Sequence, residues 1–529
     1  MTVALTVDGR QVEIRQDGVS LLDALRDELG LRSPKDGCSP QGQCGCCTVL
    51  VDGSPRVASV TAVRRVAGRA VTTADGLDPE IRTRLTEAFV DSGASQCGFC
   101  TPGILCRLAS LGTDPTPARV ESALLAHLCR CPGWRTVVEA ATRAGDGPTL
   151  PRGPRAPRDL VAAARRASLE GGVAQRVGPD IVSGAGGFAD DTAPREALVA
   201  VPDGAGGWAI GETLSEARAA AGKVQGRRSG QPVSHPLDPP PGDWALTLQT
   251  AWVEPAYLEP DASWCAPGGQ PASPLANGGA FGAKTASPAP AAARRLADHH
   301  RRPVRVVLSR EDVVLQGVKR PPMAAGVRPD GTGVVRLARC PAAAAAIKAF
   351  APGLEVVEVD LAGPVASGAV RGAGWAEAAV LVVGAVARGA PTARRANATV
   401  TSPAGGRAEA VVDVDELGLP TSVEVSVACG DPLDEVVLRS YVTGAAHMAL
   451  GWVCSEGLGL DEGGQPVDLT IRSFGILRAK DTPAVTVHVE TAGGPPVNGS
   501  DAAFAAVAAA TWIAQGLPPA WPTIRGAFK

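Results

Sequence analysis

The placement of its cysteines constrains this chain more than any other feature. Nine of the 13 cysteines lie before residue 132, and most of these fall into two tight groups. The N-terminal sequence MTVALTVDGR has no basic start followed by an apolar stretch, so we expect no secretion signal and a cytoplasmic protein. In a reducing compartment, clustered cysteines favour metal binding over disulfides. We therefore expect metal chemistry in the N-terminal quarter of the chain.

Length and charge exclude several other classes. At 529 residues the chain is long enough for several domains. A net charge of −3 lacks the excess of positive charge that is typical of proteins that bind nucleic acid. The longest apolar runs, Ala378–Ala387 and Ala502–Ala514, are too short to span a bilayer, so we expect no membrane insertion.

The second cysteine group consists of two close pairs, Cys97 with Cys100 and Cys129 with Cys131. Four thiolates in two pairs can form a tetrahedral sulfur site for zinc or for iron and sulfide. Each pair precedes an expected helix, whose free N–H groups and positive dipole end stabilise anionic sulfur. Spacing alone leaves zinc and iron–sulfur both open.

The first group favours iron–sulfur chemistry. Cys38, Cys44 and Cys47 lie in the glycine-rich loop GCSPQGQCGCC, with five and then two residues between them. This spacing is close to the C-x4-C-x2-C loop of plant-type ferredoxins, in which glycines let the backbone wrap the cluster. Cys46 is a further thiol in the loop, and in an extended segment it should point away from Cys47.

Local patterns predict the elements around these loops. Residues 1–76 read as β structure with one helix: strands Val3–Val7, Val12–Ile14 and Thr48–Val51, and a helix from the cap Ser20 to Leu29. Residues 77–144 read as four helices that start near Pro79, Pro102, Pro117 and Gly133. Residues 145–177 are predicted as a linker because their first part is rich in Pro, Gly and Arg, and residues 178–529 as a mixed α+β region.

Taken together, the two loops resemble the two-cluster region of the xanthine dehydrogenase, aldehyde oxidoreductase and carbon monoxide dehydrogenase family, the molybdenum hydroxylases. The matching strings are QCGCCTV from Gln43, QCGFCTPG from Gln96 and LCRC from Leu128. The resemblance implies a β-grasp ferredoxin-like domain, a four-helix [2Fe–2S] domain and two [2Fe–2S] clusters. It implies as cluster ligands Cys38, Cys44, Cys47, Cys97, Cys100, Cys129 and Cys131.

The fourth ligand of the first cluster departs from the family pattern. Ser59 stands where the family has a cysteine after the turn Val51-Asp52-Gly53. A serine oxygen can ligate iron, but its proton is much harder to remove than that of a thiol. The first cluster is therefore Ser59-ligated, completed by Cys46, or weakly held, and the sequence leaves all three open.

Residues 178–529 resemble a shortened molybdopterin-binding subunit of the same family. The similar segments are Glu254–Pro260, Gly278–Lys284 (GGAFGAK), Arg302–Glu311, Ala369–Gly374 (AVRGAG) and Gly444–Gly451. The resemblance implies a molybdopterin-type molybdenum cofactor in this chain or in a partner. It assigns as cofactor-binding residues Gln96, Gly279, Ala280, Phe281, Gly282, Arg371 and Gly372.

The positions at which this sequence departs from the family pattern correspond to the family's active site. Ser440-Tyr441 stands where the family has a Gly-Gln motif. Asp501 aligns with the catalytic Glu, which acts as a general base, and it is one methylene shorter. An alternative interpretation makes Asp501 the N-cap of the Ala-rich helix that follows.

Three functions follow. In the first, which we favour, the chain is an iron–sulfur electron-transfer component whose second half is degenerate. It passes electrons from a molybdopterin site to a separate flavin subunit or another acceptor. A full-length molybdenum subunit is then a further partner. In the second, it is a self-contained hydroxylase of a small molecule: an aldehyde, a purine or an N-heterocycle. In the third, it is a zinc-binding structural protein.

Overall fold

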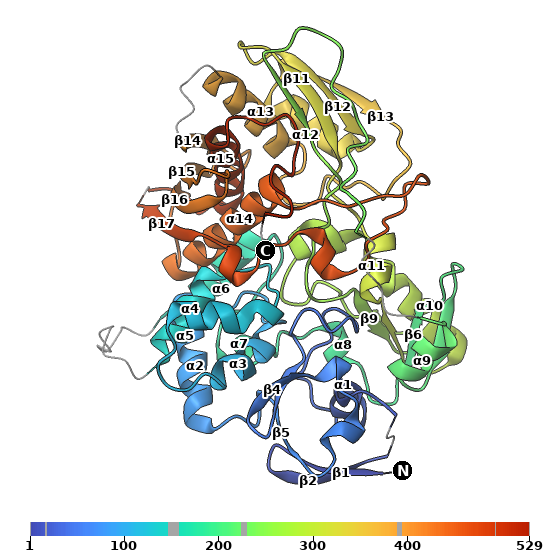
Figure 1. Ribbon diagram of the computed structural model, residues 1–529. Helices are drawn as coiled ribbons and strands as arrows, with labels where there is room; N and C mark the ends of the chain where they lie inside the picture. The colour runs from blue at the N-terminus through green and yellow to red at the C-terminus, as the bar shows by residue number, and fades with distance from the viewer. Residues whose placement is uncertain are drawn as a thin grey trace.

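The computed structural model describes residues 2–15, 18–145, 158–223, 230–388, 394–491 and 493–527. The chain runs from an N-terminal sheet at one end of the molecule, through a helical domain, to two further sheets at the other end (Figure 1). Helices and sheets are mixed throughout, as the α+β prediction requires. Within these described ranges no helix is long and apolar enough to cross a membrane.

The N-terminal sheet has the order β2-β1-β5-β3-β4. Only β1 and β5 pair in parallel among its neighbours. Ser20 and Asp23 form the predicted capping box at the start of a helix that continues as a π-helix over Ala24–Glu28. The strands and the helix are β1 (Val3–Val7), β2 (Arg10–Ile14), β3 (Thr48–Val51), β4 (Ser54–Val57), β5 (Ala70–Thr72) and α1 (Leu21–Asp23).

The helical domain follows directly. Asp78 caps the first of its helices ahead of a proline at the first helical position, and Thr116 does the same for the third. The predicted starts at Pro79 and Pro117 are thus confirmed, while the other two helices start within two residues of their predicted positions. The helices are α2 (Pro79–Ser92), α3 (Thr101–Ala109), α4 (Pro117–Ala123) and α5 (Arg135–Arg143).

The two N-terminal domains are joined by backbone contacts at the cysteine loops. A Cβ on Gly103, at the start of α3, would lie 2.3 Å from the Gly45 carbonyl oxygen and 2.7 Å from that of Cys46. The Leu128 N–H also donates to the Cys44 carbonyl oxygen at 2.9 Å. Glycine at 103 therefore allows the two cysteine loops to touch.

The predicted linker is only partly an irregular connection. Its Pro-rich residues 146–157 lie outside the described residues, but residues 160–171 form helix α6 (Leu160–Gly171), which Asp159 caps. The helix packs against α14 (Glu435–Cys454). The sequence prediction missed α6 because the Pro- and Gly-rich run before it dominated the pattern.

A second sheet, β7-β6-β10-β9, lies beside the cysteine domains, with α9, α10 and α11 around it (Figure 1). The sheet and its helices are α8 (Ala189–Thr192), β6 (Leu198–Pro202), β7 (Trp208–Gly211), α9 (Leu214–Ala220), β9 (Ala262–Cys265), α10 (Ala289–His300), β10 (Val304–Val307) and α11 (Arg310–Gln316). The short helix α7 (Pro179–Val182) packs against α2 of the helical domain instead.

Two further sheets, β13-β12-β11-β8 and β14-β15-β16-β17, share the largest hydrophobic core with the long buried helices α14 and α15. Alanine dominates α15, which lets the sheet and α14 pack closely on both of its sides. The elements are β8 (Leu246–Gln249), β11 (Met323–Val327), β12 (Gly333–Ala338), α12 (Pro341–Phe350), β13 (Leu354–Val359), α13 (Trp375–Ala387), β14 (Arg395–Thr401), β15 (Arg407–Val414), β16 (Pro420–Ala428), β17 (Ala484–Glu490) and α15 (Ser500–Ala514).

Candidate functional site

The second cysteine group is arranged as two pairs, each formed across two loops. The Cys100 and Cys129 sulfurs are 3.2 Å apart, and those of Cys131 and Cys97 are 3.9 Å apart. Two thiolates on one tetrahedral metal with bonds of about 2.3 Å stand about 3.8 Å apart. The pairs therefore fit two iron atoms with two protein ligands each, which is the ligand set of a [2Fe–2S] cluster.

Crowding of these thiols favours a bound cation. The hydrogen bond with Cys129 and burial raise the pKa of Cys100 well above its ordinary value. The hydrogen bond that Cys97 accepts from Cys131 lowers the pKa of Cys97. Four thiolates this close repel one another unless metal charge neutralises them.

Long-range contacts hold the loops of the second group in place. Arg130, between two of the cysteines, donates through Nη2 to Glu456 Oε2 at 2.6 Å, and both side chains are buried. Gln96 donates through Nε2 to the Cys131 carbonyl oxygen and to Ser440 Oγ, both at 3.1 Å. The C-terminal half of the chain thus fixes the loop that carries Cys129 and Cys131.

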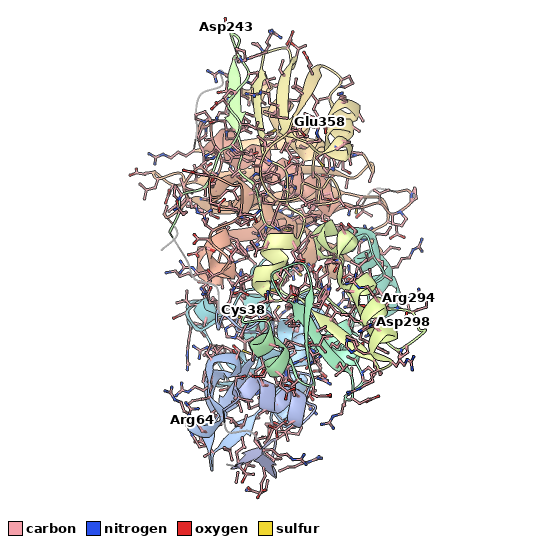
Figure 2. The ribbon with its side chains drawn as sticks, turned by 90° about the vertical axis from the view of Figure 1, so that its right-hand side faces the viewer. Cys38, Arg64, Asp243, Arg294, Asp298 and Glu358 are labelled. Atoms are coloured by element: carbon pink, nitrogen blue, oxygen red, sulfur yellow. The ribbon has the colours of Figure 1, made fainter. Side chains whose placement is uncertain are left out.

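The first cysteine group is fully buried. Cys38, Cys44 and Cys47 each have 1% of their surface exposed, and Cys38 lies in the interior where the N-terminal domain meets the rest of the chain (Figure 2). Backbone N–H groups approach two of the sulfurs: Gln43 N lies 3.3 Å from Cys38 Sγ, and Ser59 N lies 3.4 Å from Cys47 Sγ. Such N–H contacts to sulfur are typical of iron–sulfur loops.

Cys46 does not lie in an extended segment, contrary to the prediction. Residues 46 and 47 form a turn before β3, because the loop must reverse after Gly45. A Cβ on Gly37 would lie 2.9 Å from Cys46 Sγ and 3.1 Å from Cys44 Sγ. The two thiols therefore share the space that glycine leaves at position 37.

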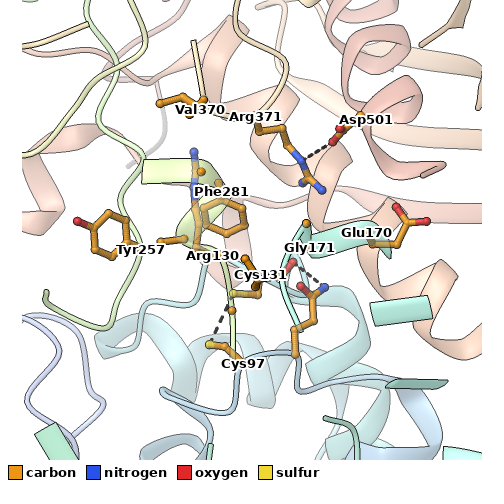
Figure 3. A pocket seen from close by; sticks show the side chains of 18 of the residues that line it. Cys97, Arg130, Cys131, Glu170, Gly171, Tyr257, Phe281, Val370, Arg371 and Asp501 are labelled. Carbon is orange, nitrogen blue, oxygen red and sulfur yellow. Dashed lines mark hydrogen bonds and ion pairs between the residues drawn. The ribbon is translucent and has the colours of Figure 1, made fainter. Parts of the chain in front are cut away.

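A cavity of about 430 Å³ adjoins the second cysteine group (Figure 3). Cys97 and Cys131 lie on one side of it, and Arg371 and Asp501 on the other. Every residue predicted to bind a cofactor lines this cavity: Gln96, Gly279, Ala280, Phe281, Gly282, Arg371 and Gly372. The structure thus brings together residues that are up to about 400 positions apart in the sequence.

Two glycine-containing segments meet in the cavity wall. Arg371 N donates to the Phe281 carbonyl oxygen at 2.9 Å. Gly282 has a φ of +85°, and a Cβ there would lie 1.7 Å from the Ala369 carbonyl oxygen. Only glycine fits at 282, so the backbone contact between the two segments depends on it.

Asp501 is held by an ion pair. Its Oδ1 accepts from Arg371 Nε at 2.9 Å, and Arg371 Nη2 donates to Ser500 Oγ at 2.7 Å. The interpretation of Asp501 as an N-cap is wrong, because Gly499 occupies the cap position of α15 and Asp501 lies inside the first turn. The Asp501 side chain faces the cavity instead, with 31% of its surface exposed.

Three further polar residues line the cavity, and the sequence gave none of them a role. Glu259 pairs with Lys284 Nζ at 2.7 Å, and burial raises the pKa of Glu259 to about 6. Tyr441 donates to Gln175 Oε1 at 2.6 Å. Glu259 belongs to the segment Glu254–Pro260 quoted for the resemblance, which is the signal that could have identified it; Gln175 lies in the predicted linker and had none.

Comparison with known proteins agrees with this geometry. Residues 5–67 match the 2Fe–2S iron–sulfur cluster binding domain, and residues 73–142 match the [2Fe–2S] binding domain. The chain is 36% identical over 152 residues to the nicotinate dehydrogenase small FeS subunit of Eubacterium barkeri, covering 27% of this chain and 93% of that protein. This chain belongs to the molybdenum hydroxylase family. Like its relatives, this molybdenum hydroxylase family member carries two [2Fe–2S] binding domains.

Other members of the family are much longer than the matched region. The aldehyde oxidoreductase of Megalodesulfovibrio gigas is 40% identical over 144 residues, which is 26% of this chain and only 16% of that protein. In structure, the aldehyde oxidoreductase from Desulfovibrio gigas aligns with a TM-score of 0.69 at 15% identity, covering 96% of this chain and 97% of that one. This likeness shows that the C-terminal part of this molybdenum hydroxylase family member shares the fold of an aldehyde oxidoreductase.

Proposed function

We propose that this chain is the iron–sulfur electron-transfer component of a molybdenum hydroxylase-type oxidoreductase, and that its second half is catalytically degenerate. The observation that carries the proposal is the position of Cys97 and Cys131 in the cavity wall. A cluster on these sulfurs is reached from the cavity side, whereas the first group is enclosed by protein. Electrons would enter at the second cluster and cross the contact between the two cysteine loops to the first.

The chain fits the [2Fe–2S] clusters better than it fits a molybdopterin cofactor. The paired thiols fit [2Fe–2S] clusters. The cavity offers glycine backbone and the Gln96 amide to a ring system, but its charges do not suit a phosphate-bearing pterin. Of its lining cations, Arg130 pairs with Glu456 and Arg371 with Asp501. The lining carboxylates Glu170 and Glu259 are paired in turn with Arg166 and Lys284, so among the described residues the lining offers a phosphate no cation that is not already paired.

Asp501 also lacks the setting of a general base. Its Oδ1 already accepts from Arg371 Nε at 2.9 Å, so this oxygen is engaged by a guanidinium instead of facing a substrate proton. Substrate oxidation is therefore assigned to a partner, a full-length molybdenum subunit. A separate flavin subunit or another acceptor would take the electrons from the first cluster.

A second candidate function is a self-contained hydroxylase that oxidises an aldehyde, a purine or an N-heterocycle. It is favoured by the meeting of the glycine segments, Arg371 and Asp501 around one cavity beside Cys97. A mononuclear zinc site has less support, because among the described residues no three or more His, Cys, Asp or Glu side chains are arranged to hold a single ion.

Metal analysis of the purified chain separates these functions. The proposal expects about four iron atoms per chain, from two clusters of two irons each, with no molybdenum. It also expects an iron–sulfur EPR signal after dithionite reduction and substrate turnover only when a molybdenum subunit is added. Molybdenum near one per chain with turnover by the chain alone would support the second candidate and overturn the proposal. Zinc with no iron would overturn both.

A further inference from the structure

The fourth ligand of the first cluster can be identified from the arrangement of the buried donors. Three cysteines supply three ligands, and two buried side chains compete for the fourth place, Ser59 and Cys46. We propose that Ser59 Oγ ligates the first cluster and that Cys46 does not. This inference rests on the proposed iron–sulfur role and concerns only which atom completes the cluster.

Ser59 lies where a partner for Cys47 is needed. It sits in a short 3-10 helix, Ala58–Val60, directly after β4 (Ser54–Val57), and Ala58 N donates to the Cys47 carbonyl oxygen at 3.3 Å. The Cys47 thiol donates to Ser59 Oγ at 3.3 Å. A sulfur and an oxygen on one tetrahedral metal, with bonds of about 2.3 and 2.0 Å, stand about 3.5 Å apart. Ser59 and Cys47 thus form a donor pair of the same kind as Cys97 with Cys131.

Cys46 lies beside Cys44, since a Cβ on Gly37 would lie 2.9 Å from Cys46 Sγ and 3.1 Å from Cys44 Sγ. Cys38 interacts with the same Cys44 thiol. Cys38 and Cys44 already form one pair, so Cys46 would be a third protein ligand on an iron that needs two. Cys46 also interacts electrostatically with Cys100 of the second group. It is therefore a buried side chain between the two clusters.

The chemistry of a serine ligand is accessible to iron. A metal ion lowers the pKa of a bound hydroxyl-type oxygen by many units, as it does for bound water, so Ser59 can bind as the alkoxide. An alkoxide is a harder donor than a thiolate and stabilises the ferric state more. The first cluster should therefore have a lower reduction potential than the same cluster with cysteine at position 59.

Three single variants test the assignment in the full chain: Ser59→Ala, Ser59→Cys and the matched control Cys46→Ala. The measurements are iron per chain, EPR of the reduced protein and the midpoint potential of each cluster. The second cluster's signal reports in every variant whether the protein has folded.

We expect S59A to lose the first cluster's wild-type signal, with iron falling by up to half, while the second cluster's signal stays. C46A should keep both signals and both potentials, and S59C should keep both clusters with a raised potential for the first. An unchanged first-cluster signal and potential in S59A, or loss of that signal in C46A, would overturn the assignment. Either result would leave the proposed electron-transfer function standing, because that function is tested separately on the wild-type chain, by its iron and molybdenum content and by turnover without a partner.

Discussion

Replacing Arg130 by methionine should destabilise the protein far more than removing a surface ion pair. Arg130 and Glu456 have 3% and 2% of their side chains exposed, and R130M leaves the Glu456 carboxylate buried without its partner. Removing one partner of a buried pair costs about 3–5 kcal/mol of unfolding free energy. The matched control, R339M, breaks the pair with Asp360, whose side chains are 56% and 76% exposed, and should cost far less stability because solvent screens an exposed pair.

The double variant R130M/E456L separates pairing from packing. Because apolar side chains of similar volume often replace a buried ion pair without loss, it should recover most of the stability that R130M loses. Burial already raises the pKa of Glu456. Without Arg130 this pKa rises further, so the folded state binds the proton more tightly than the unfolded state and R130M should regain stability as pH falls from 7 to 5.

The assay is urea unfolding followed by circular dichroism and by the visible absorbance of the clusters. Arg130 lies between Cys129 and Cys131, so R130M should also lose cluster absorbance at lower urea than R339M. Equal losses in R130M and the double variant, or in R130M and R339M, would refute the account of Arg130 as the partner of a buried charge.

Three further outcomes are expected. Burial lowers the pKa of His447 to about 3, so the folded state resists protonation of this imidazole. The free energy of unfolding should therefore fall as the pH drops from about 6.5 towards 3, by up to about 1.4 kcal/mol per pH unit. H447Q should flatten this slope in urea titrations, and an unchanged slope would contradict the argument. G282A should have a much lower melting temperature than G268A. The new Cβ at 282 would lie 1.7 Å from the Ala369 carbonyl oxygen, whereas one at 268 would have no atom within 4 Å. Equal melting temperatures would show that the backbone around Ala369 can move to accommodate the methyl group. D501N should change two rates by no more than about twofold from wild type: electron transfer from the dithionite-reduced chain to an acceptor dye, and substrate turnover by the complex with its molybdenum subunit. A loss of turnover of about 10²-fold or more would instead identify Asp501 as a catalytic base.

Local signals in the sequence were sufficient for much of the N-terminal quarter. Ser20, Asp78 and Thr116 mark helix starts through their own neighbours, and each is a cap in the structure. The two cysteine loops were also visible from spacing, but the structure pairs their sulfurs across the loops, Cys100 with Cys129 and Cys97 with Cys131. These features depend on residues a few positions apart, which a sequence displays directly.

The electrostatics of the site could not be predicted in this way. Arg130 and Glu456 are 326 positions apart, and Arg371 and Asp501 are 130 apart. Which carboxylate meets which guanidinium depends on how the sheets and α14 pack, and no local pattern encodes that choice. For the same reason the sequence left Ser59 and Cys46 equal as candidates, although in the folded chain Ser59 contacts Cys47 and Cys46 lies beside Cys44.

The unequal burial of the two cysteine groups has a consequence for how the protein matures. Cys97 and Cys131 line a cavity, so iron and sulfide can reach the second group in a folded chain. Cys38, Cys44 and Cys47 are enclosed, and α3 closes on their loop at Gly103. A folded apoprotein would accordingly refill the second cluster first, and the first would wait for its loop to open. In the cell, the first cluster would therefore be inserted while the chain is being synthesised and folded, before its loop closes.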